Sequence, residues 1–187
     1  MARGKAQQGD TAARLVAAAA QEFNKHGFAG TDSNKIARRA GFAPQTFYRW
    51  FRDKREIFVA VYRAWEDEET RVIGGLLAAG APMSALIDAV VAHHRAYRVF
   101  RRSLRQLAVE DKVVRRALME SRRRQIERTQ QWAGPEARSA AEIAPLLLQL
   151  ERLCDGVAEG ELDELGVDEE GARQAIAALL RQTRRHP

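Results

Sequence analysis

The sequence has almost no cysteine and no long apolar run, and both shortages narrow the possible classes of protein. Its 187 residues include one cysteine, Cys154, which excludes an internal disulfide framework and fits a reducing compartment. No apolar run approaches the ~20 residues of a membrane-spanning helix. The opening residues, MARGKAQQGD, lack the apolar segment of a secretory signal. We therefore expect a cytoplasmic protein that does not enter a membrane.

The short motifs that carry catalysis or phosphate binding are also missing. There is no glycine-rich phosphate loop, no HExxH metal motif and no nucleophile elbow. Cys154 with His93 and His94 is the one grouping that suggests a nucleophile pair or a metal site. However, adjacent histidines point about 100° apart on a helix, and a cysteine on an apolar stripe is usually a small core residue. We expect no enzyme activity, no cofactor and no metal.

Positive charge is in excess and is unevenly distributed. The net charge is +6. Residues 1–55 contain 11 Lys and Arg against 4 Asp and Glu, whereas the remaining residues contain 20 against 21. A basic segment beside a near-neutral one is typical of nucleic-acid binding, because Lys and Arg neutralise phosphates and release counterions.

Residues 33–51, SNKIARRAGFAPQTFYRWF, predict two short helices joined by a tight turn. Asp32 can cap the first helix, and Gly41 suits the left-handed position that ends it. Pro44 can occupy the first position of the second helix, where its missing N–H costs nothing. This is the plan of a helix-turn-helix, although an ordinary αα-hairpin has the same pattern.

The second of these helices has one apolar face and one polar face. Phe47, Trp50 and Phe51 recur at helical spacing and would pack on the first helix. The opposite face carries groups that can donate to phosphate oxygens or base edges, namely Gln45, Thr46, Tyr48, Arg49 and Arg52.

The rest of the chain is also helical in pattern, with no convincing strand. We expect an all-α protein of about nine helices, with one of them spanning about residues 83–100. We expect residues 1–9 to be a disordered tail and residues 10–53 to form a three-helix, helix-turn-helix DNA-binding domain. Residues 54–187 would form a helical bundle for ligand binding and dimerisation.

The segment from Gly27 to Phe58 resembles the tetracycline-repressor (TetR) family of bacterial transcriptional regulators. The positions that match the family pattern are Gly27-Phe28, Thr31, Ile36-Ala37, Ala40-Gly41, Phe47-Tyr48-Arg49-Trp50-Phe51 and Lys54. The match covers roughly residues 10–60, and the remainder agrees only in architecture. The turn departs from the family, because Ala43 stands where many members have a serine that caps the second helix, a bond worth ~1 kcal/mol.

The resemblance implies a homodimer that binds a near-palindromic double-stranded DNA operator. We favour a repressor that an unidentified small-molecule effector releases; an activator or a regulator without a ligand is the alternative. Gln45 is the expected base reader, because an amide can pair with an adenine edge. Two members of the contact set have a structural alternative: Thr31 could cap its own turn and Tyr48 could be half-buried. The DNA contacts are expected at Thr31, Ser33, Asn34, Pro44, Gln45, Thr46, Tyr48, Arg49 and Lys54.

Ligands in this family sit among the fourth, fifth and seventh helices. The resemblance therefore implies a pocket there, although each candidate could equally be plain core. The candidates are Tyr62, Trp65, His94, Tyr97, Phe100 and Met119.

Two recognition helices are needed to read a palindrome, so a dimer is expected. The apolar bands of the last two helices offer an interface, unless they face their own core. These bands contain Leu146, Leu147, Leu150, Leu153, Ile176, Leu179 and Leu180.

Residues 95–128 form a basic belt, with twelve Lys and Arg against four acids. This belt either is a solvated face paired with the acidic residues 159–170 or attracts an anionic ligand. The sequence also leaves open an enzyme in the second domain and a helical protein–protein adaptor with a vestigial helix-turn-helix.

Overall fold

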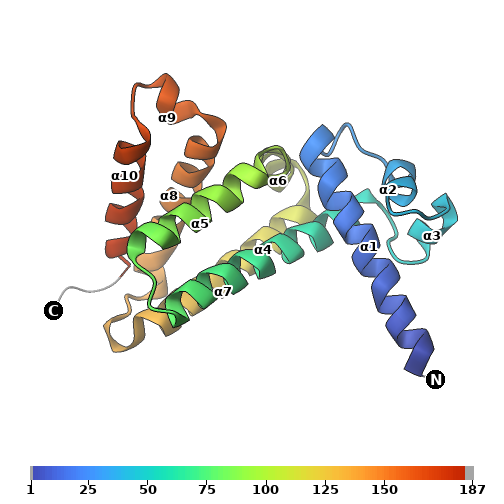
Figure 1. The fold of residues 1–187 in the computed structure, drawn as a ribbon, viewed down its shortest axis with the longest axis horizontal. Helices are drawn as coiled ribbons and strands as arrows, with labels where there is room; N and C mark the ends of the chain where they lie inside the picture. The colour runs from blue at the N-terminus through green and yellow to red at the C-terminus, as the bar shows by residue number, and fades with distance from the viewer. Residues whose placement is uncertain (1, 184–187) are drawn as a thin grey trace. The chain divides into compact units, whose positions relative to one another are not determined.

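The computed structural model describes the backbone of residues 2–183, and the side chains from Asp10 onward except at residue 136. This range contains ten α-helices, one short 3₁₀ helix and no strand (Figure 1). The predicted all-α class is therefore confirmed. The helices are α1 Ala2–His26, α2 Ser33–Arg39, α3 Pro44–Tyr48, α4 Lys54–Ala78, α5 Met83–Ala96, α6 Arg98–Glu110, α7 Lys112–Ala133, η1 Gly134–Glu136, α8 Ala140–Glu159, α9 Glu161–Glu164 and α10 Glu169–Arg181.

Contacts divide the chain into two compact units. Unit 1 contains the residues up to 66 together with 99–117, and unit 2 contains 67–98 together with the residues from 118 onward. The long helices α4 and α7 each contribute residues to both units. This grouping does not show where independent domains begin, so the expected boundaries after residues 9 and 53 stay predictions. The helix α1 nevertheless begins at Ala2, where a tail was expected.

The core of unit 1 is rich in aromatic rings. The apolar stripe of α1, which is Leu15, Ala19 and Phe23, is completely buried. The ring of Phe58 lies 5.0 Å from that of Phe23 and 4.7 Å from that of Phe100. Aromatic pairs at this separation contribute beyond the area that they bury. The first residues of α6 are therefore part of the same core as α1 and α4.

The core of unit 2 is aliphatic and is built from α5, α8 and α10. Its buried members are Ile87, Val91, Cys154, Val157, Ala172 and Ile176. Cys154 is thus a small core residue within this cluster. Ser139 begins α8 with a capping box, in which its side chain accepts from the backbone N–H of Glu142 and the Glu142 carboxylate accepts from the backbone N–H of Ser139.

The predicted single helix over about residues 83–100 is wrong. The chain leaves helical geometry at Tyr97, where φ is −118° and ψ is 21°, and α6 starts at Arg98. The break coincides with the passage from unit 2 to unit 1. Helical periodicity continues across such a junction because each side keeps its own apolar stripe, so the sequence pattern does not show the break.

Within residues 2–183, no helix is both long enough and apolar enough to cross a lipid bilayer.

Candidate nucleic-acid interface

Local sequence signals build the turn between α2 and α3. The Asp32 carboxylate accepts from the backbone N–H of Lys35 at 2.8 Å and caps α2. At the other end, Gly41 has φ +77°, a conformation that disfavours any side chain. The N–H of Phe42 then donates to the carbonyl of Ala37 at 2.9 Å, so the last carbonyls of α2 are satisfied. As predicted, α2 stops at this glycine.

The start of α3 also follows the sequence prediction. Pro44 occupies the first turn, and Ala43 stands at the N-cap with no side-chain hydrogen bond. The ring of Phe47 is completely buried and lies 5.8 Å from that of Phe51. This anchor holds α3 against the buried face of α2, which is Ile36 and Ala37.

Arg14 braces this turn from α1, and sequence reasoning missed it. Its guanidinium donates to the carbonyl of Ala40 at 2.9 Å and lies 4.5 Å from the centre of the Phe42 ring. Both contacts span more than 25 residues of sequence, so no local pattern could have indicated them.

The exposed face of α3 carries most of the predicted contact residues. Gln45 and Arg49 are exposed, and the Tyr48 side chain is 59% exposed. The Tyr48 hydroxyl lies 2.7 Å from that of Ser33, which joins the start of α2 to the end of α3. Asn34 is exposed beside Ser33, whereas Pro44 and Thr46 are half-buried. The structure therefore does not have the half-buried Tyr48 side chain that was the alternative.

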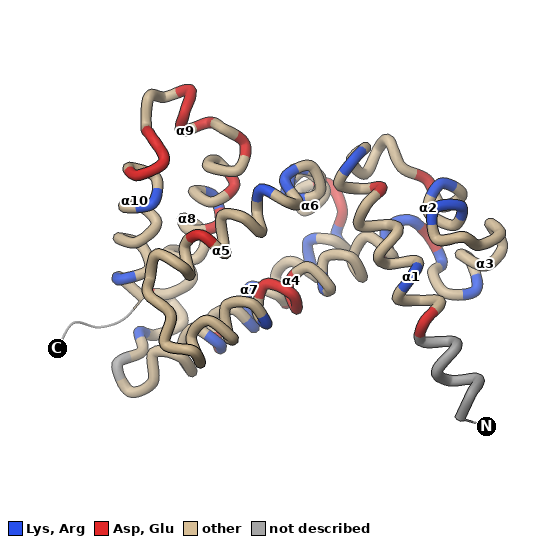
Figure 2. The backbone as a smooth tube through the Cα atoms, in the orientation of Figure 1, with Lys and Arg blue, Asp and Glu red and all other residues tan. Residues whose placement is uncertain are grey.

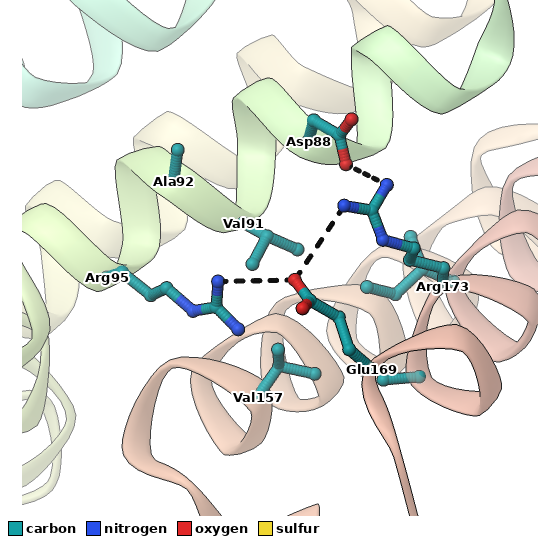
Figure 3. Close-up of a pocket in the computed structure, with 9 residues that line it drawn as sticks. Asp88, Val91, Ala92, Arg95, Val157, Glu169 and Arg173 are labelled. Atoms are coloured by element: carbon teal, nitrogen blue, oxygen red, sulfur yellow. Dashed lines mark hydrogen bonds and ion pairs between the residues drawn. The ribbon is translucent and has the colours of Figure 1, made fainter.

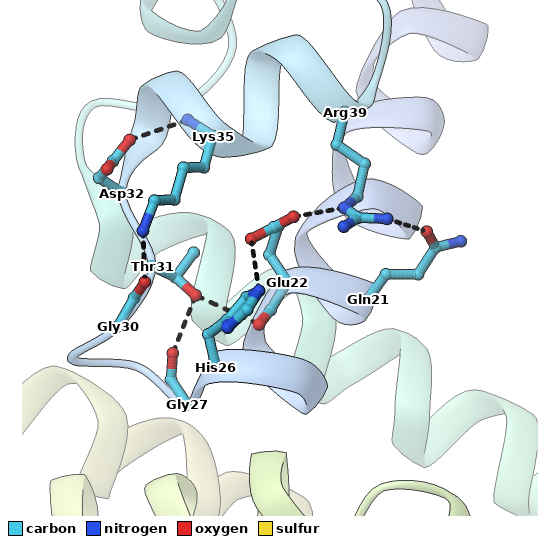
Figure 4. A network of polar contacts seen from close by, with 9 residues as sticks. All are labelled: Gln21, Glu22, His26, Gly27, Gly30, Thr31, Asp32, Lys35 and Arg39. Carbon is cyan, nitrogen blue, oxygen red and sulfur yellow. Dashed lines mark hydrogen bonds and ion pairs between the residues drawn. The ribbon is translucent and has the colours of Figure 1, made fainter.

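Thr31 and Lys54 do not lie on that face. Thr31 is 3% exposed, and its hydroxyl lies within hydrogen-bonding distance of the carbonyls of Glu22 and Gly27 (Figure 4). The Lys54 ammonium donates to the carbonyls of Phe28 and Thr31, both at 2.8 Å. Burial lowers the pKa of Lys54. Both side chains brace the loop before α2, and the phosphate contacts expected of them stay predictions.

A polar network fixes α2 against α1 (Figure 4). The buried carboxylate of Glu22 accepts from the guanidinium of Arg39, which also donates to Gln21 at 3.2 Å. Lys35 donates to the carbonyl of Gly30 at 2.9 Å. Two of the basic residues of α2 are therefore engaged in holding the fold. Among the described residues, Arg38 on α2 and Arg49 after α3 are exposed and have no ion-pair partner, and Arg38 is a further candidate contact that the sequence analysis did not name.

Charge separates more sharply between the two units than along the chain. Unit 1 carries 18 Lys and Arg against 8 Asp and Glu, a net charge of +10. Unit 2 carries 13 against 17, a net charge of −4. Figure 2 shows Lys and Arg along α2 and at the start of α4. The fold therefore places the helix-turn-helix in a strongly basic unit, as binding to a polyanion requires.

The members of the basic belt, residues 95–128, are divided between the two units. Arg95 lies 3.5 Å from Glu169, within the acidic stretch expected to pair with it. Arg122 lies 2.6 Å from Glu151, and the guanidinium of Arg101 lies 4.6 Å from the centre of the Trp65 ring.

The six residues expected to line a pocket are also divided. Tyr62, Trp65 and Phe100 are buried in unit 1, whereas His94, Tyr97 and Met119 belong to unit 2. His94 is buried, with Nδ1 at 2.9 Å from Asp155 and Nε2 at 3.6 Å from Glu69. The Tyr97 hydroxyl donates to Glu68 at 3.3 Å, and its pKa is raised by burial and by that carboxylate. The pocket stays a prediction.

The residues expected at a dimer interface vary in exposure. Ile176 is buried in the core of its own unit, and Leu150, Leu153 and Leu180 pack partly against that core. Leu146, Leu147 and Leu179 are half-buried outside it. Leu148, which the sequence analysis did not name, is 46% exposed on α8. Part of the apolar band thus faces its own core, and the rest stays available for a partner.

Comparisons with known proteins agree with the resemblance seen in the sequence. Residues 15–61 match the family model described as bacterial regulatory proteins, tetR family. A transcriptional regulator from Rhodococcus sp. Rha1 has the same fold, with a TM-score of 0.69 at 15% identity over 92% of this chain and 95% of that one. A search of curated proteins found no match.

Two further solved structures share the fold. A putative TetR-family transcriptional regulator from Rhodococcus sp. aligns with a TM-score of 0.67 at 17% identity over 93% of this chain and 98% of that one. The fatty acid degradation regulator FadR from Bacillus halodurans aligns with 0.62 at 12% identity over 91% and 93%. The tetR-family match thus covers residues 15–61, and the solved structures show that the shared fold extends along nearly the whole chain.

Proposed function

We propose that this protein is a cytoplasmic, homodimeric repressor that binds a near-palindromic operator and is released from it by a small-molecule ligand. The observation that carries the proposal is the exposed face of α3, where Gln45, Tyr48 and Arg49 stand on a firmly braced helix-turn-helix. The net charge of +10 on the surrounding unit supplies the non-specific attraction to phosphate.

We assign the contacts to two classes by their chemistry. Gln45 and Arg49 reach base edges, because an amide pairs with adenine and a guanidinium with guanine. Ser33, Asn34, Thr46, Tyr48 and Arg38 contact phosphates and set the register of α3. Thr31 and Lys54 brace the loop before α2, and Lys54 keeps a third N–H that can donate to a phosphate.

A mobility shift on DNA from the region upstream of the protein's own gene tests this assignment. The Gln45→Ala and Arg49→Ala variants should each lose about ten-fold in affinity for the specific site, since a good bidentate base contact contributes about 1–3 kcal/mol. Arg38→Ala should weaken specific and non-specific binding alike and reduce the salt slope by about one. Arg181→Ala, an exposed arginine of α10, is the matched charge control. Unchanged affinity in both α3 variants would favour the adaptor alternative.

The dimer follows from the same reasoning about palindromes. We place its interface on the outer apolar surface of α8 and α10, at Leu146, Leu147, Leu148 and Leu179. Light scattering on a size-exclusion column should give twice the chain mass for the wild type. Leu147→Glu should give a monomer with an unchanged helical spectrum, and a monomeric wild type would refute this part of the proposal.

Ligand release requires two conformations with different affinities for the ligand. A difference of a few kcal/mol is enough to change occupancy of the operator. The helices α4 and α7 each contribute residues to both units, and we assign the coupling to α4 because it directly follows the helix-turn-helix. Transcription from the operator in a purified system separates repression from activation, because added protein lowers the transcript level only for a repressor.

A further inference from the structure

Unit 2 contains a pocket of about 190 Å³ between α5, α8 and α10 (Figure 3). Its apolar lining includes Val91, Val157, Ala172 and Ile176, which belong to the buried core of the unit. A dry cavity of about 150 Å³ can hold benzene, so this pocket has room for one six-membered ring with a short substituent. It shares no residue with the pocket that the family resemblance implies.

Two arginines at the rim converge on a single carboxylate oxygen. Nη1 of Arg95, on α5, lies 3.5 Å from Oε1 of Glu169, and Nη2 of Arg173, on α10, lies 3.7 Å from the same atom (Figure 3). Charge-assisted hydrogen bonds are about 2.7–2.9 Å long, so neither arginine binds this carboxylate closely. The Glu169 side chain is 60% exposed. It is therefore a loosely held acid between two cations, and it can turn into solvent at little cost.

We propose that this pocket binds a small monocarboxylate with a compact apolar body, and that its carboxylate replaces Glu169 between Arg95 and Arg173. The apolar body lies on the Val91 and Val157 side of the pocket, where its burial supplies the hydrophobic part of the affinity. Two guanidinium groups from different helices can each donate a charge-assisted hydrogen bond to the carboxylate.

The charge of the rim favours a single negative charge on the ligand. Arg173 is also paired with Asp88, which stays at the rim when Glu169 leaves. Two arginines and one remaining aspartate leave a net charge of +1, which a monocarboxylate neutralises. A phosphate dianion would carry one negative charge in excess. The proposal does not depend on repression, because the binding is measured in the absence of DNA.

Isothermal titration of the full chain with benzoate tests the proposal, with benzamide as a neutral analogue of the same shape. Benzoate should bind saturably, and benzamide at least about ten-fold more weakly, because it loses the charge-assisted bonds. Arg95→Gln should weaken benzoate binding by about ten-fold for the same reason. Arg181→Gln, an exposed arginine at the end of α10 that does not line the pocket, should leave it unchanged.

The decisive variant is Glu169→Gln, because it removes the internal competitor and leaves both arginines in place. Benzoate should then bind several-fold more tightly, whereas Glu170→Gln, the neighbouring exposed acid outside the pocket, should have no such effect. Absence of saturable benzoate binding in both the wild type and Glu169→Gln overturns the proposal. Equal binding of benzoate and benzamide that Arg95→Gln does not change also overturns it. Operator binding without benzoate is measured separately, so failure here and failure of the repressor assignment are distinguishable.

Discussion

Unit 1 and unit 2 differ in net charge and in the kind of side chains that form their cores. Unit 1 has a net charge of +10 and a core joined by the rings of Phe23, Phe58 and Phe100. Unit 2 has a net charge of −4 and an aliphatic core, with the buried contact between His94 and Asp155 elsewhere in the unit. Like charges repel and destabilise a compact unit. The aromatic core thus lies in the unit whose basic surface is proposed to bind DNA, and the aliphatic core lies in the unit with the proposed carboxylate site.

Removing an aromatic ring from the core of unit 1 should cause the largest loss of stability. Phe58→Ala deletes the ring that contacts Phe23, Phe28 and Phe100, and should cost about 3–5 kcal/mol of unfolding free energy. Thermal unfolding should show the loss, and DNA binding should disappear with it. Ile176→Ala, in the unit 2 core, should destabilise by about 2–5 kcal/mol but leave DNA binding intact at low temperature. Equal loss of DNA binding in both variants would contradict the separation of the two units.

Removing the buried contact between His94 and Asp155 should destabilise unit 2 by a smaller amount. Asp155→Ala removes the carboxylate at 2.9 Å from His94 Nδ1, and both side chains are buried. Removing one partner of a buried hydrogen bond leaves the other unsatisfied, which costs about 1–3 kcal/mol. Urea unfolding followed by circular dichroism measures this, with the exposed Asp163→Ala as control, for which we expect a change within about 0.5 kcal/mol. A cost near zero would mean that the pair is not holding unit 2 together.

The capping box of α8 should make a smaller, pH-dependent contribution. The Ser139 hydroxyl and backbone N–H donate to the Glu142 carboxylate and lower the pKa of Glu142 below its ordinary value of 4.5. A lowered pKa in the folded state means that the stabilisation is present above about pH 4.5 and is lost as the pH falls through the folded value.

Ser139→Ala should therefore cost about 1 kcal/mol at pH 7, and the gap from the wild type should narrow at pH 3. Thermal unfolding at the two pH values is the measurement, and a gap that widens toward low pH would refute the assignment.

Adding a capping side chain to α3 should have the smallest effect, and this effect should be stabilising. Ala43→Ser places a hydroxyl at the N-cap, where no side chain now accepts from the first turn, and should add about 0.5–1 kcal/mol to the stability. Ala13→Ser, at an exposed position inside α1, should instead be slightly destabilising, because serine is a weaker helix former than alanine. Chemical unfolding distinguishes the two variants. If Ala43→Ser has the same free energy of unfolding as the wild type, the packing of Phe47 alone holds α3 in place.

The helix-turn-helix was predictable because its signals are local. Asp32, Gly41 and Pro44 each act on backbone groups within a few residues of themselves, so their roles follow from residue type and spacing. The brace of Arg14 and the pairing of Glu22 with Arg39 were not predictable, since each joins residues 17 or more positions apart. The break at Tyr97 was missed for a related reason, because it depends on which core each helix joins.

The sequence by itself determined the all-α class, the position of the helix-turn-helix and the excess of positive charge beside it, because these depend on propensity, capping and composition. Only the tertiary structure decided which polar groups remain available. It turned Lys54 and Thr31 inward onto backbone carbonyls, left Arg38 exposed, and brought residues 99–117 into the basic unit. It also set Arg95 and Arg173 around one carboxylate. These outcomes depend on packing between residues distant in the chain, which local patterns do not encode.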